Sequence, residues 1–302
     1  MMPTRIEWAE ETWNPVTGCT PISPGCANCY AQRMANRLAG RFGYPAENPF
    51  HVTLHPDKLK DPLKWKKPRQ VFMCSMGDLF HEDVPDAFIT DVFDQMYRAK
   101  HHTYLLLTKR SERMRWFFQA NGPLIGKDPE PNIWLGVTAE NQEQADKRIP
   151  VLLQTPAAVR FVSVEPMLGP IILSSQYYDY LQGWNVYPEH DPSCDGSCSA
   201  GRCPVPVQYE TEKLDWVICG GETGPGARPM HPDWARSLRD QCKAAGVSFF
   251  FKQWGEWYPD KKGIYERGDS AIFGNTVVHR VGKKAAGRLL DGREWNEMPE
   301  VE

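Results

Sequence analysis

Short apolar runs rich in β-branched and aromatic residues recur along the chain, and each run ends in small or polar residues. These runs cover residues 71–75, 103–108, 132–138, 159–165, 214–221 and 247–253. Apolar runs of this length, bounded by turn-forming residues, predict buried strands. One more strand is expected near Thr12 to Thr17, so the sequence predicts seven.

Segments with apolar residues at helical spacing separate several of these strands. The clearest cover residues 85–100, 140–153 and 232–245, and the last opens with Pro232 and closes before Gly246, as helices commonly do. Alternation of strands and helices predicts a parallel sheet. Seven strands favour an α/β fold with a complete or partial TIM-like (β/α) barrel, and an open doubly wound sheet is the alternative.

Two parts of the chain break this pattern. Residues 173–213 are rich in turns and cysteines and show no sustained period, which indicates an insertion. Beyond residue 253 the chain has hairpin-like segments with many glycines and charges. We therefore expect a barrel domain over residues 1–253 that contains this Cys-rich insertion, followed by a C-terminal extension over residues 254–302.

The distribution of apolar and charged residues also predicts where the protein works. No run of about eighteen apolar residues occurs, and acidic residues stand where a signal peptide needs cationic and then apolar ones. We expect a cytoplasmic protein with no membrane partner. Thiols stay reduced in that compartment, so clustered cysteines predict metal ligands rather than disulfides, and six of the nine cysteines fall in two clusters.

The first cluster is Cys19, Cys26 and Cys29, on a Gly- and Pro-rich loop that runs into a helical pattern. Tight turns allow thiolates to gather, and the following helix directs its positive N-terminal dipole at an anionic site. Three thiolates leave one metal position open for an exogenous ligand, which is typical of catalytic centres. The sequence predicts an iron–sulfur cluster here. The alternatives are a zinc knuckle completed by His51 or His55, and three unrelated buried thiols.

The second cluster offers a full tetrahedral set of nitrogen and sulfur ligands, consisting of His190, Cys194, Cys198 and Cys203. Such a set suits structural Zn²⁺, which would stabilise an insertion with little apolar periodicity. A second iron–sulfur cluster or free thiols are the alternatives. Three cysteines in strand or helix contexts, Cys74, Cys219 and Cys242, are predicted to be core thiols.

Polar residues collect where the predicted strands end, and in a parallel barrel the carboxyl ends of the strands carry the chemistry. These residues include Gly77, Asp78, Lys109, Arg110, Thr138, Glu140, Asn141, Ser163, Glu165, Gly221, Glu222, Lys252 and Gln253. We expect Glu165 to pair with Lys252 and Gln253. Helix caps and solvated groups are the competing explanation for any one of them.

Several motifs carry a family resemblance. They are WNPVTGC-x6-C-x-NCY from residue 13, MGDLF from 76, SVEPMLGP from 163, CGGETG from 219 and RVGKKAAGRLLDGR from 280. Together they resemble a phage- and bacteria-borne family of three-Cys-motif proteins whose reactions are largely unassigned. The loop also resembles the radical S-adenosylmethionine superfamily, whose usual spacing is Cys-x3-Cys-x2-Cys, whereas the first gap here is six residues.

This resemblance implies that Cys19, Cys26 and Cys29 hold a [4Fe–4S] cluster. Its fourth iron would bind S-adenosylmethionine, and an external reductant would trigger formation of a 5′-deoxyadenosyl radical. The resemblance also implies cofactor contacts of Asp78 with Gly77 at the methionyl amine and of Tyr30 at the adenine. Strand order alone suggests Thr138, Asn141 and Ser163 at the ribose or carboxylate. The two glycines that include Gly221 allow close backbone approach and Glu222 can accept a hydrogen bond, which suggests an adenine or substrate contact, with a tight turn as the alternative.

The net charge of −3 excludes a globally basic nucleic-acid binder, but three basic stretches, at 58–69, 98–116 and 280–288, leave room for local patches. Cations interleaved with tryptophans suit phosphates and bases, although solvated helices give the same pattern. With the phage-linked resemblance, this predicts a nucleotide or modified base in phage DNA as substrate, with isomerisation of a base substituent in the host cytoplasm.

Candidate substrate-binding residues are Lys109, Arg110, Glu165 and Lys252. Two other functions stay open. One is a zinc-dependent nucleic-acid-binding protein without catalysis. The other is a hydrolase that uses the carboxylates Asp78, Glu165 and Glu222.

Overall fold

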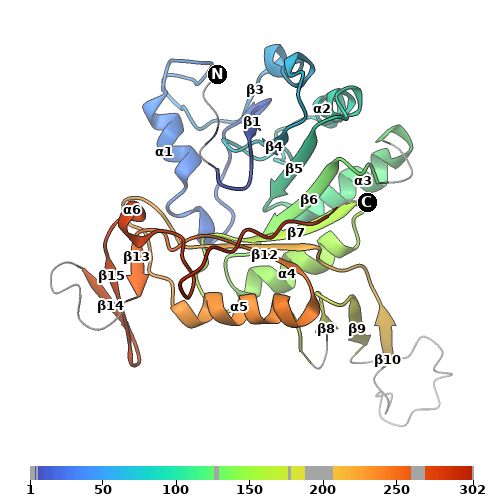
Figure 1. The fold of residues 1–302 in the computed structure, drawn as a ribbon. Coiled ribbons are helices and arrows are strands. Elements are labelled where there is room, and N and C mark those ends of the chain that lie inside the picture. The colour runs from blue at the N-terminus through green and yellow to red at the C-terminus, as the bar shows by residue number, and fades with distance from the viewer. Residues whose placement is uncertain are drawn as a thin grey trace, which may run out of the picture.

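The computed structural model describes residue 4 and residues 6–125, 129–175, 178–187, 207–259 and 269–300. At its centre is a seven-stranded parallel sheet with the order β1-β4-β5-β6-β7-β11-β12 (Figure 1). The strands are β1 (Glu11–Trp13), β4 (Gln70–Met73), β5 (Thr103–Thr108), β6 (Ile133–Thr138), β7 (Val159–Val164), β11 (Trp216–Gly220) and β12 (Ser248–Gln253). The predicted number of strands is confirmed.

The strand order never reverses along the sheet, so the sheet is singly wound rather than doubly wound. It curls into a half-barrel whose two edges are β1 and β12. The prediction of a parallel α/β fold with a barrel-like sheet is therefore confirmed in its partial form. A small antiparallel pair, β2 (Val16–Thr17) with β3 (Thr53–Leu54), lies beside the start of the sheet.

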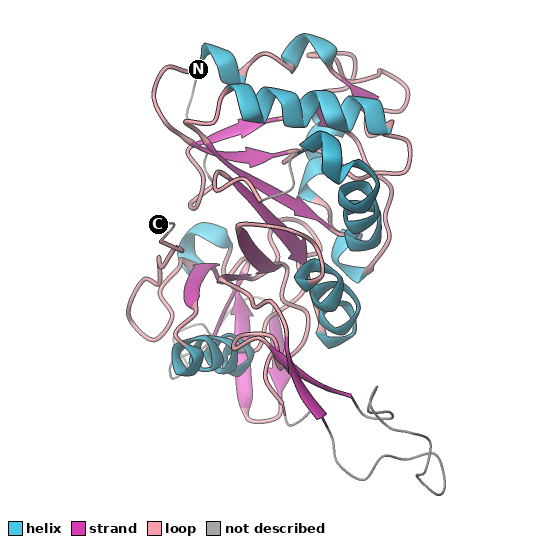
Figure 2. Cartoon of the chain, turned by 90° about the vertical axis from the view of Figure 1, so that its right-hand side faces the viewer, coloured by secondary structure: helices cyan, strands magenta, loops and turns pink. Residues whose placement is uncertain are grey.

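Helices cover the outer face of the sheet (Figure 2). On this face lie α2 (Asp86–Arg98), α3 (Ser111–Ile125), α4 (Gln142–Leu153) and α5 (Pro232–Ala245). The other described helices are α1 (Tyr30–Arg37) and α6 (Lys283–Ala286), with short 3-10 turns η1 (Pro24–Cys26), η2 (Pro56–Lys58) and η3 (Pro62–Lys64). The helices predicted over 85–100, 140–153 and 232–245 are confirmed, and α5 ends at Gly246 in the left-handed conformation. No helix in the described ranges is long and apolar enough to cross a membrane.

Side chains on the sheet alternate between two apolar clusters, as pleated strands require. One cluster lies between the sheet and the helices and includes the predicted core thiols Cys74, Cys219 and Cys242. The other lies inside the half-barrel, where Trp134, Phe161 and Trp216 belong to its core. Thr138 and Ser163 lie on the same inward face, at the carboxyl ends of β6 and β7, so the interior is polar at that end.

The C-terminal extension packs onto the half-barrel. Strands β13 (Trp257–Pro259), β14 (Ser270–Phe273) and β15 (Thr276–Arg280) form an antiparallel sheet, which confirms the hairpin-like pattern. Farther on, the Phe251 N–H donates to the Trp295 carbonyl at 2.9 Å, and Phe250 forms an antiparallel bridge with Asn296. The tail therefore covers the free edge of β12, which would otherwise expose unpaired backbone groups.

The described part of the insertion contains regular structure that the sequence analysis did not predict. Strands β8 (Tyr178–Asp179), β9 (Trp184–Tyr187) and β10 (Val207–Glu210) form an antiparallel sheet. The strands are too short to give a clear period, and they pair with each other rather than with the main sheet. The proposed zinc ligands His190, Cys194, Cys198 and Cys203 lie outside the described residues.

Close packing inside the half-barrel gives a first prediction. A Cβ added to Gly136 on β6 would lie 2.5 Å from ring atoms of the fully buried Phe161. We expect Gly136→Ala to lower the free energy of unfolding by about 1–3 kcal/mol through overpacking, measured by urea denaturation. The matched control is Gly169→Ala, whose Cβ would make only an ordinary contact at 3.8 Å. Equal losses in both variants would show that packing on Phe161 is not the cause.

Candidate functional site

The cysteine loop, residues 18–29, lies across the carboxyl edge of the sheet. Gly18 forms a parallel bridge with Gly77, which follows β4, and its N–H donates to the Met76 carbonyl at 2.9 Å. A side chain at Gly18 would collide with the His51 carbonyl, because a Cβ would lie 2.1 Å from that oxygen. The three cysteines of the loop are free and partly exposed. The loop thus occupies the edge where parallel barrels place their sites.

The first anchor of the loop is a buried arginine. The Nη1 of Arg110 donates to the Cys19 sulfur at 3.2 Å and lies 3.4 Å from Oδ2 of Asp78. Its Nη2 donates to the carbonyl and hydroxyl oxygens of Thr20, at 3.1 and 2.9 Å, and its Nε donates to the Glu82 carboxylate. A single guanidinium thus ties the start of the loop to the ends of β4 and β5.

The second anchor is Glu140, just beyond β6, which is completely buried. Its Oε1 accepts from the Gly25 N–H at 2.9 Å, and its Oε2 accepts from Arg148 at 3.0 Å. Burial alone raises the pKa of Glu140, but hydrogen bonds from Ser23 and Gly25, with the charge of Arg148, hold this pKa below its ordinary value. The ionised carboxylate therefore fixes the backbone next to Cys26.

The third anchor is Glu222, just beyond β11. Its carboxylate accepts from Nδ2 of Asn28 at 3.0 Å and forms a two-pronged ion pair with Arg228, with contacts of 2.8 and 2.5 Å. Asn28 also donates to the Gly226 carbonyl at 2.8 Å. Burial raises the pKa of Glu222, yet the hydrogen bonds from Arg228 and Asn28 lower it overall. This contact fixes the loop next to Cys29.

Each cysteine therefore has its own anchor, and the three anchors stand at the ends of β4 and β5, of β6 and of β11. Cys29 also serves as the N-cap residue of α1, so its thiol lies at the positive end of that helix. Burial and the neighbouring Asp78 raise the pKa of the Cys19 thiol to about 11. A metal that binds this sulfur must therefore displace a proton.

Several predicted cofactor contacts have structural tasks here. The Asp78 carboxylate accepts from the Thr108 hydroxyl at 2.8 Å and from the Phe80 N–H at 3.0 Å, as well as pairing with Arg110. Asn141 caps α4 by accepting from the Gln144 N–H at 3.0 Å. These side chains are thus already engaged by the protein itself.

The remaining predicted residues differ in exposure. Gly221 lets two backbone segments meet, because a Cβ there would lie 2.0 Å from the Trp254 carbonyl. Tyr30, the first residue of α1, is 59% exposed. The expected pairing of Glu165 is confirmed, since Lys252 lies 2.9 Å and Gln253 3.2 Å from its carboxylate.

Sequence reasoning missed several residues that build this site. Asn28, Arg148 and Arg228 were not singled out, although each contacts a carboxylate at the end of a strand. The sequence indicated one member of each pair, the carboxylate that follows a strand. Asn28 lies 194 residues from Glu222 along the chain, so no local pattern connects these two. Arg148 and Arg228 lie only 8 and 6 residues from their carboxylates and were overlooked.

Within the described ranges, no three His, Cys, Asp or Glu side chains converge closely enough to hold one metal ion. The imidazole Nε2 of His55, a candidate fourth ligand, lies 2.8 Å from the Thr17 hydroxyl and is engaged there. A single zinc ion needs all its ligands within about 2.0–2.3 Å of one point. In this conformation the loop thus lacks the arrangement of a zinc knuckle.

Several cations of the basic stretches pair with acidic side chains. Lys64 pairs with Asp61 at 2.6 Å, and Arg69 pairs with Glu11 at 2.5 Å. Trp116 on α3 is 52% exposed, and the guanidinium of Arg113 lies 4.9 Å from its ring centroid. This cation and aromatic pair is the most nucleic-acid-like feature of the basic stretches.

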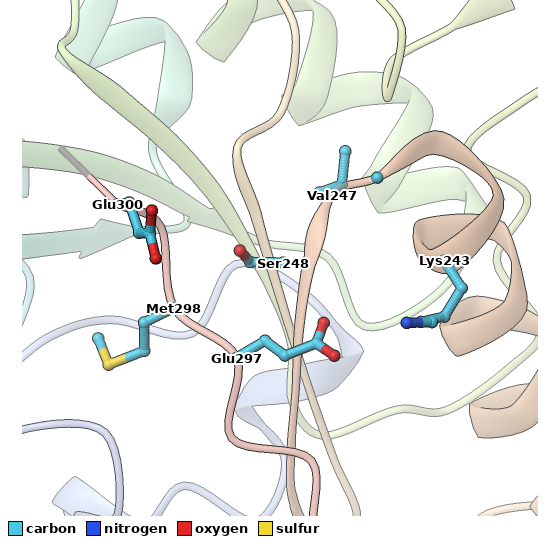
Figure 3. A pocket seen from close by; sticks show the side chains of 7 residues that line it. Lys243, Val247, Ser248, Glu297, Met298 and Glu300 are labelled. Atoms are coloured by element: carbon cyan, nitrogen blue, oxygen red, sulfur yellow. The ribbon is translucent and has the colours of Figure 1, made fainter. Parts of the chain in front are cut away.

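A hollow lies at the opposite, amino edge of the sheet (Figure 3). It is lined by Lys243, Gly246, Val247, Ser248, Glu297, Met298 and Glu300. Figure 3 shows the side chains of Lys243 and Glu297 pointing toward each other across it. The hollow has no part in the cysteine loop and does not extend the candidate site.

The charge state of Glu140 gives a second prediction. A carboxyl whose pKa is lowered by folding stabilises the protein above its ordinary pKa of 4.5, and this contribution is lost as the pH falls through the lowered value. Glu140→Gln leaves Arg148 buried without its partner, so we expect a loss of about 3–5 kcal/mol at neutral pH. The difference from wild type should shrink as the pH falls below the ordinary pKa of 4.5, measured by urea denaturation.

The matched control for this prediction is Glu143→Gln, at an exposed position in the first turn of α4. An exposed carboxyl away from the loop should change stability by no more than about 0.5 kcal/mol. A Glu140→Gln deficit that does not shrink in acid would contradict the role given to the ionised carboxylate.

Comparison with known proteins places the chain in a family. No curated protein and no solved structure matches the sequence significantly. Residues 3–299, nearly the whole chain, match a family described as "Protein of unknown function (DUF5131)". The match covers the cysteine loop, all three anchors and the C-terminal extension. The chain belongs to the DUF5131 family.

Proposed function

We propose that the cysteine loop is a cofactor site for a [4Fe–4S] cluster and S-adenosylmethionine, and that the protein is a radical S-adenosylmethionine enzyme. One observation carries this proposal: three free, partly exposed thiols stand on one loop at the carboxyl edge of a half-barrel, each next to its own anchor. Three thiols suit a centre that keeps one iron for an exogenous ligand.

The donor set is compatible with this cofactor. Cys19, Cys26 and Cys29 would each ligate a different iron, so the thiols need not converge on one point as they must for zinc. When bound, the cluster and S-adenosylmethionine supply one-electron reductive cleavage that starts radical chemistry on the substrate. The three anchors supply the rigidity that a catalytic constellation requires, because each ties the loop to a strand of the sheet.

The interior of the half-barrel presents polar groups next to the loop. Thr138 and Ser163 lie on the inward face, and the Glu165–Lys252 ion pair joins the end of β7 to β12. These groups can hydrogen-bond a polar cofactor or substrate. Farther in, the apolar cluster around Trp134 and Trp216 fills the interior.

The two alternative functions have weaker support. A hydrolase would need Asp78, Glu165 or Glu222 free for acid–base chemistry, but these carboxylates pair with Arg110, Lys252 and Arg228. A zinc-dependent nucleic-acid-binding protein would depend on the ligands of the insertion, which lie outside the described residues. The anchored loop therefore favours the cluster.

For the substrate, we propose a nucleotide or a modified base in DNA, with isomerisation of a base substituent as the reaction. The support is the half-buried Lys109 directly beside the loop anchor Arg110, together with the exposed Trp116 and Arg113 on the adjoining helix. A cation at the site and an aromatic surface nearby suit a phosphate and a base.

Iron content tests the cofactor. Anaerobically reconstituted wild-type protein should be brown, contain iron and sulfide, and release 5′-deoxyadenosine when reduced with S-adenosylmethionine. We expect Cys26→Ala to lose the iron, the colour and the product, because one cluster ligand is gone. The control is Cys242→Ala, which removes a buried thiol on α5 and should retain all three. Colourless wild-type protein that holds zinc would overturn the proposal.

Salt-dependent DNA binding tests the substrate class. We expect wild-type protein to bind single-stranded or duplex DNA with an affinity that falls as salt rises. Lys109→Ala should weaken binding and reduce the salt slope by about one. The matched control is Lys100→Ala, at the exposed opposite end of β5, which should bind as wild type. Binding that is absent, or insensitive to salt, would contradict a DNA substrate.

A further inference from the structure

Arg110 does more than anchor the loop, because one of its nitrogens points at a proposed cluster ligand. Its Nη1 lies 3.2 Å from the Cys19 sulfur, within hydrogen-bonding distance. The other two nitrogens are held by Thr20 and Glu82, which leaves Nη1 aimed at the sulfur. The side chain is only 4% exposed, so water cannot easily compete for this contact.

The surroundings of Arg110 fix its orientation from several sides. Asp78 approaches Nη1 at 3.4 Å, and its carboxylate is itself held by Thr108. Thr20, which accepts from Nη2, also contacts Nε2 of His81 at 2.8 Å. The guanidinium plane is thus clamped by residues that follow β4 and β5, and it cannot rotate away from the loop without breaking these contacts.

Other cations near the loop act differently. Arg148 contacts Glu140 and the Thr138 carbonyl, and Arg228 contacts Glu222. Among the described residues, Arg110 is the one cationic side chain that hydrogen-bonds a sulfur of the loop. A donor and positive charge at a ligand sulfur stabilise the more negative, reduced state of an iron–sulfur cluster.

We propose that Arg110 is a positioning residue that donates a hydrogen bond to the Cys19 sulfur of the loaded cluster and thereby raises the cluster's reduction potential. The inference rests on the proposed function. In the redox step, one electron passes from a low-potential reductant, with dithionite as the probe, into the cluster. No covalent bond forms or breaks in this step, and the Arg110 proton stays on nitrogen.

The test compares midpoint potentials of reconstituted full-length proteins without substrate. We expect Arg110→Gln to keep its cluster but to lower the equilibrium constant for one-electron reduction about tenfold, a shift of about 59 mV to more negative potential. Arg110→Lys, which restores the charge with a single donor group, should lie between this variant and wild type. The matched control Arg236→Gln removes a charge on α5 that pairs with Asp233, and should leave the potential unchanged.

The outcomes separate the inference from the proposed function. An unchanged potential in a loaded Arg110→Gln protein overturns the inference and leaves the cluster intact. The inference is also overturned if both Arg110 variants fold, as judged by circular dichroism, but neither binds iron, because Arg110 then only builds the loop. A wild-type protein without a cluster overturns the proposed function itself, and the inference with it.

Discussion

The structure depends on the pairing of buried charges at the carboxyl edge of the sheet. Glu140 is completely buried, and a carboxylate in that position is tolerable only with cations and N–H donors around it. Part of that compensation comes from the protein interior, through Arg148, and part from the cysteine loop, through the Gly25 N–H. The loop therefore supplies one of the hydrogen bonds that the buried Glu140 carboxylate needs. This contact gives the Gly- and Pro-rich loop a defined position.

Packing of segments from both ends of the chain explains why the sheet stops at a half-barrel. The N-terminal Trp8 and the tail around Glu297 both contact Trp216 inside the curl, the first through ring packing and the second through a hydrogen bond of 2.8 Å from the indole N–H. These segments fill the inner face at the amino end and cover the edge of β12, so further strands are not needed to close it. At the carboxyl end of the sheet, the cysteine loop covers the strand ends.

Much of the fold could be predicted from the sequence, because strand and helix periods are local. The seven strands, the three clearest helices and the crowding of polar residues at one edge followed from patterns within about 15 residues. Apart from the pairing of Glu165 with Lys252 and Gln253, the partners of those polar residues did not. Arg110 was expected at the substrate and Asp78 at S-adenosylmethionine, yet they pair with each other across 32 residues, and Arg110 reaches Cys19 across 91. The sequence analysis identified the carboxylates at the strand ends. Their contacts with the cysteine loop could not be predicted, because these contacts depend on how the sheet curls. The short strands of the insertion were missed because two to four residues cannot show a period.

The three anchors are not equivalent in charge, and this difference bears on the chemistry of the loop. At Glu140 and Glu222 the carboxylate faces the loop and accepts from a neutral N–H, while the arginine lies behind it. At Cys19 the order is reversed, since the arginine faces the loop and the carboxylates of Asp78 and Glu82 stand behind it. Two anchors thus present negative charge toward the loop and one presents positive charge. A cluster bound by three thiolates gains an electron more readily beside the positive group. In the proposed cluster, the side next to Arg110 would therefore be the side favoured for reduction.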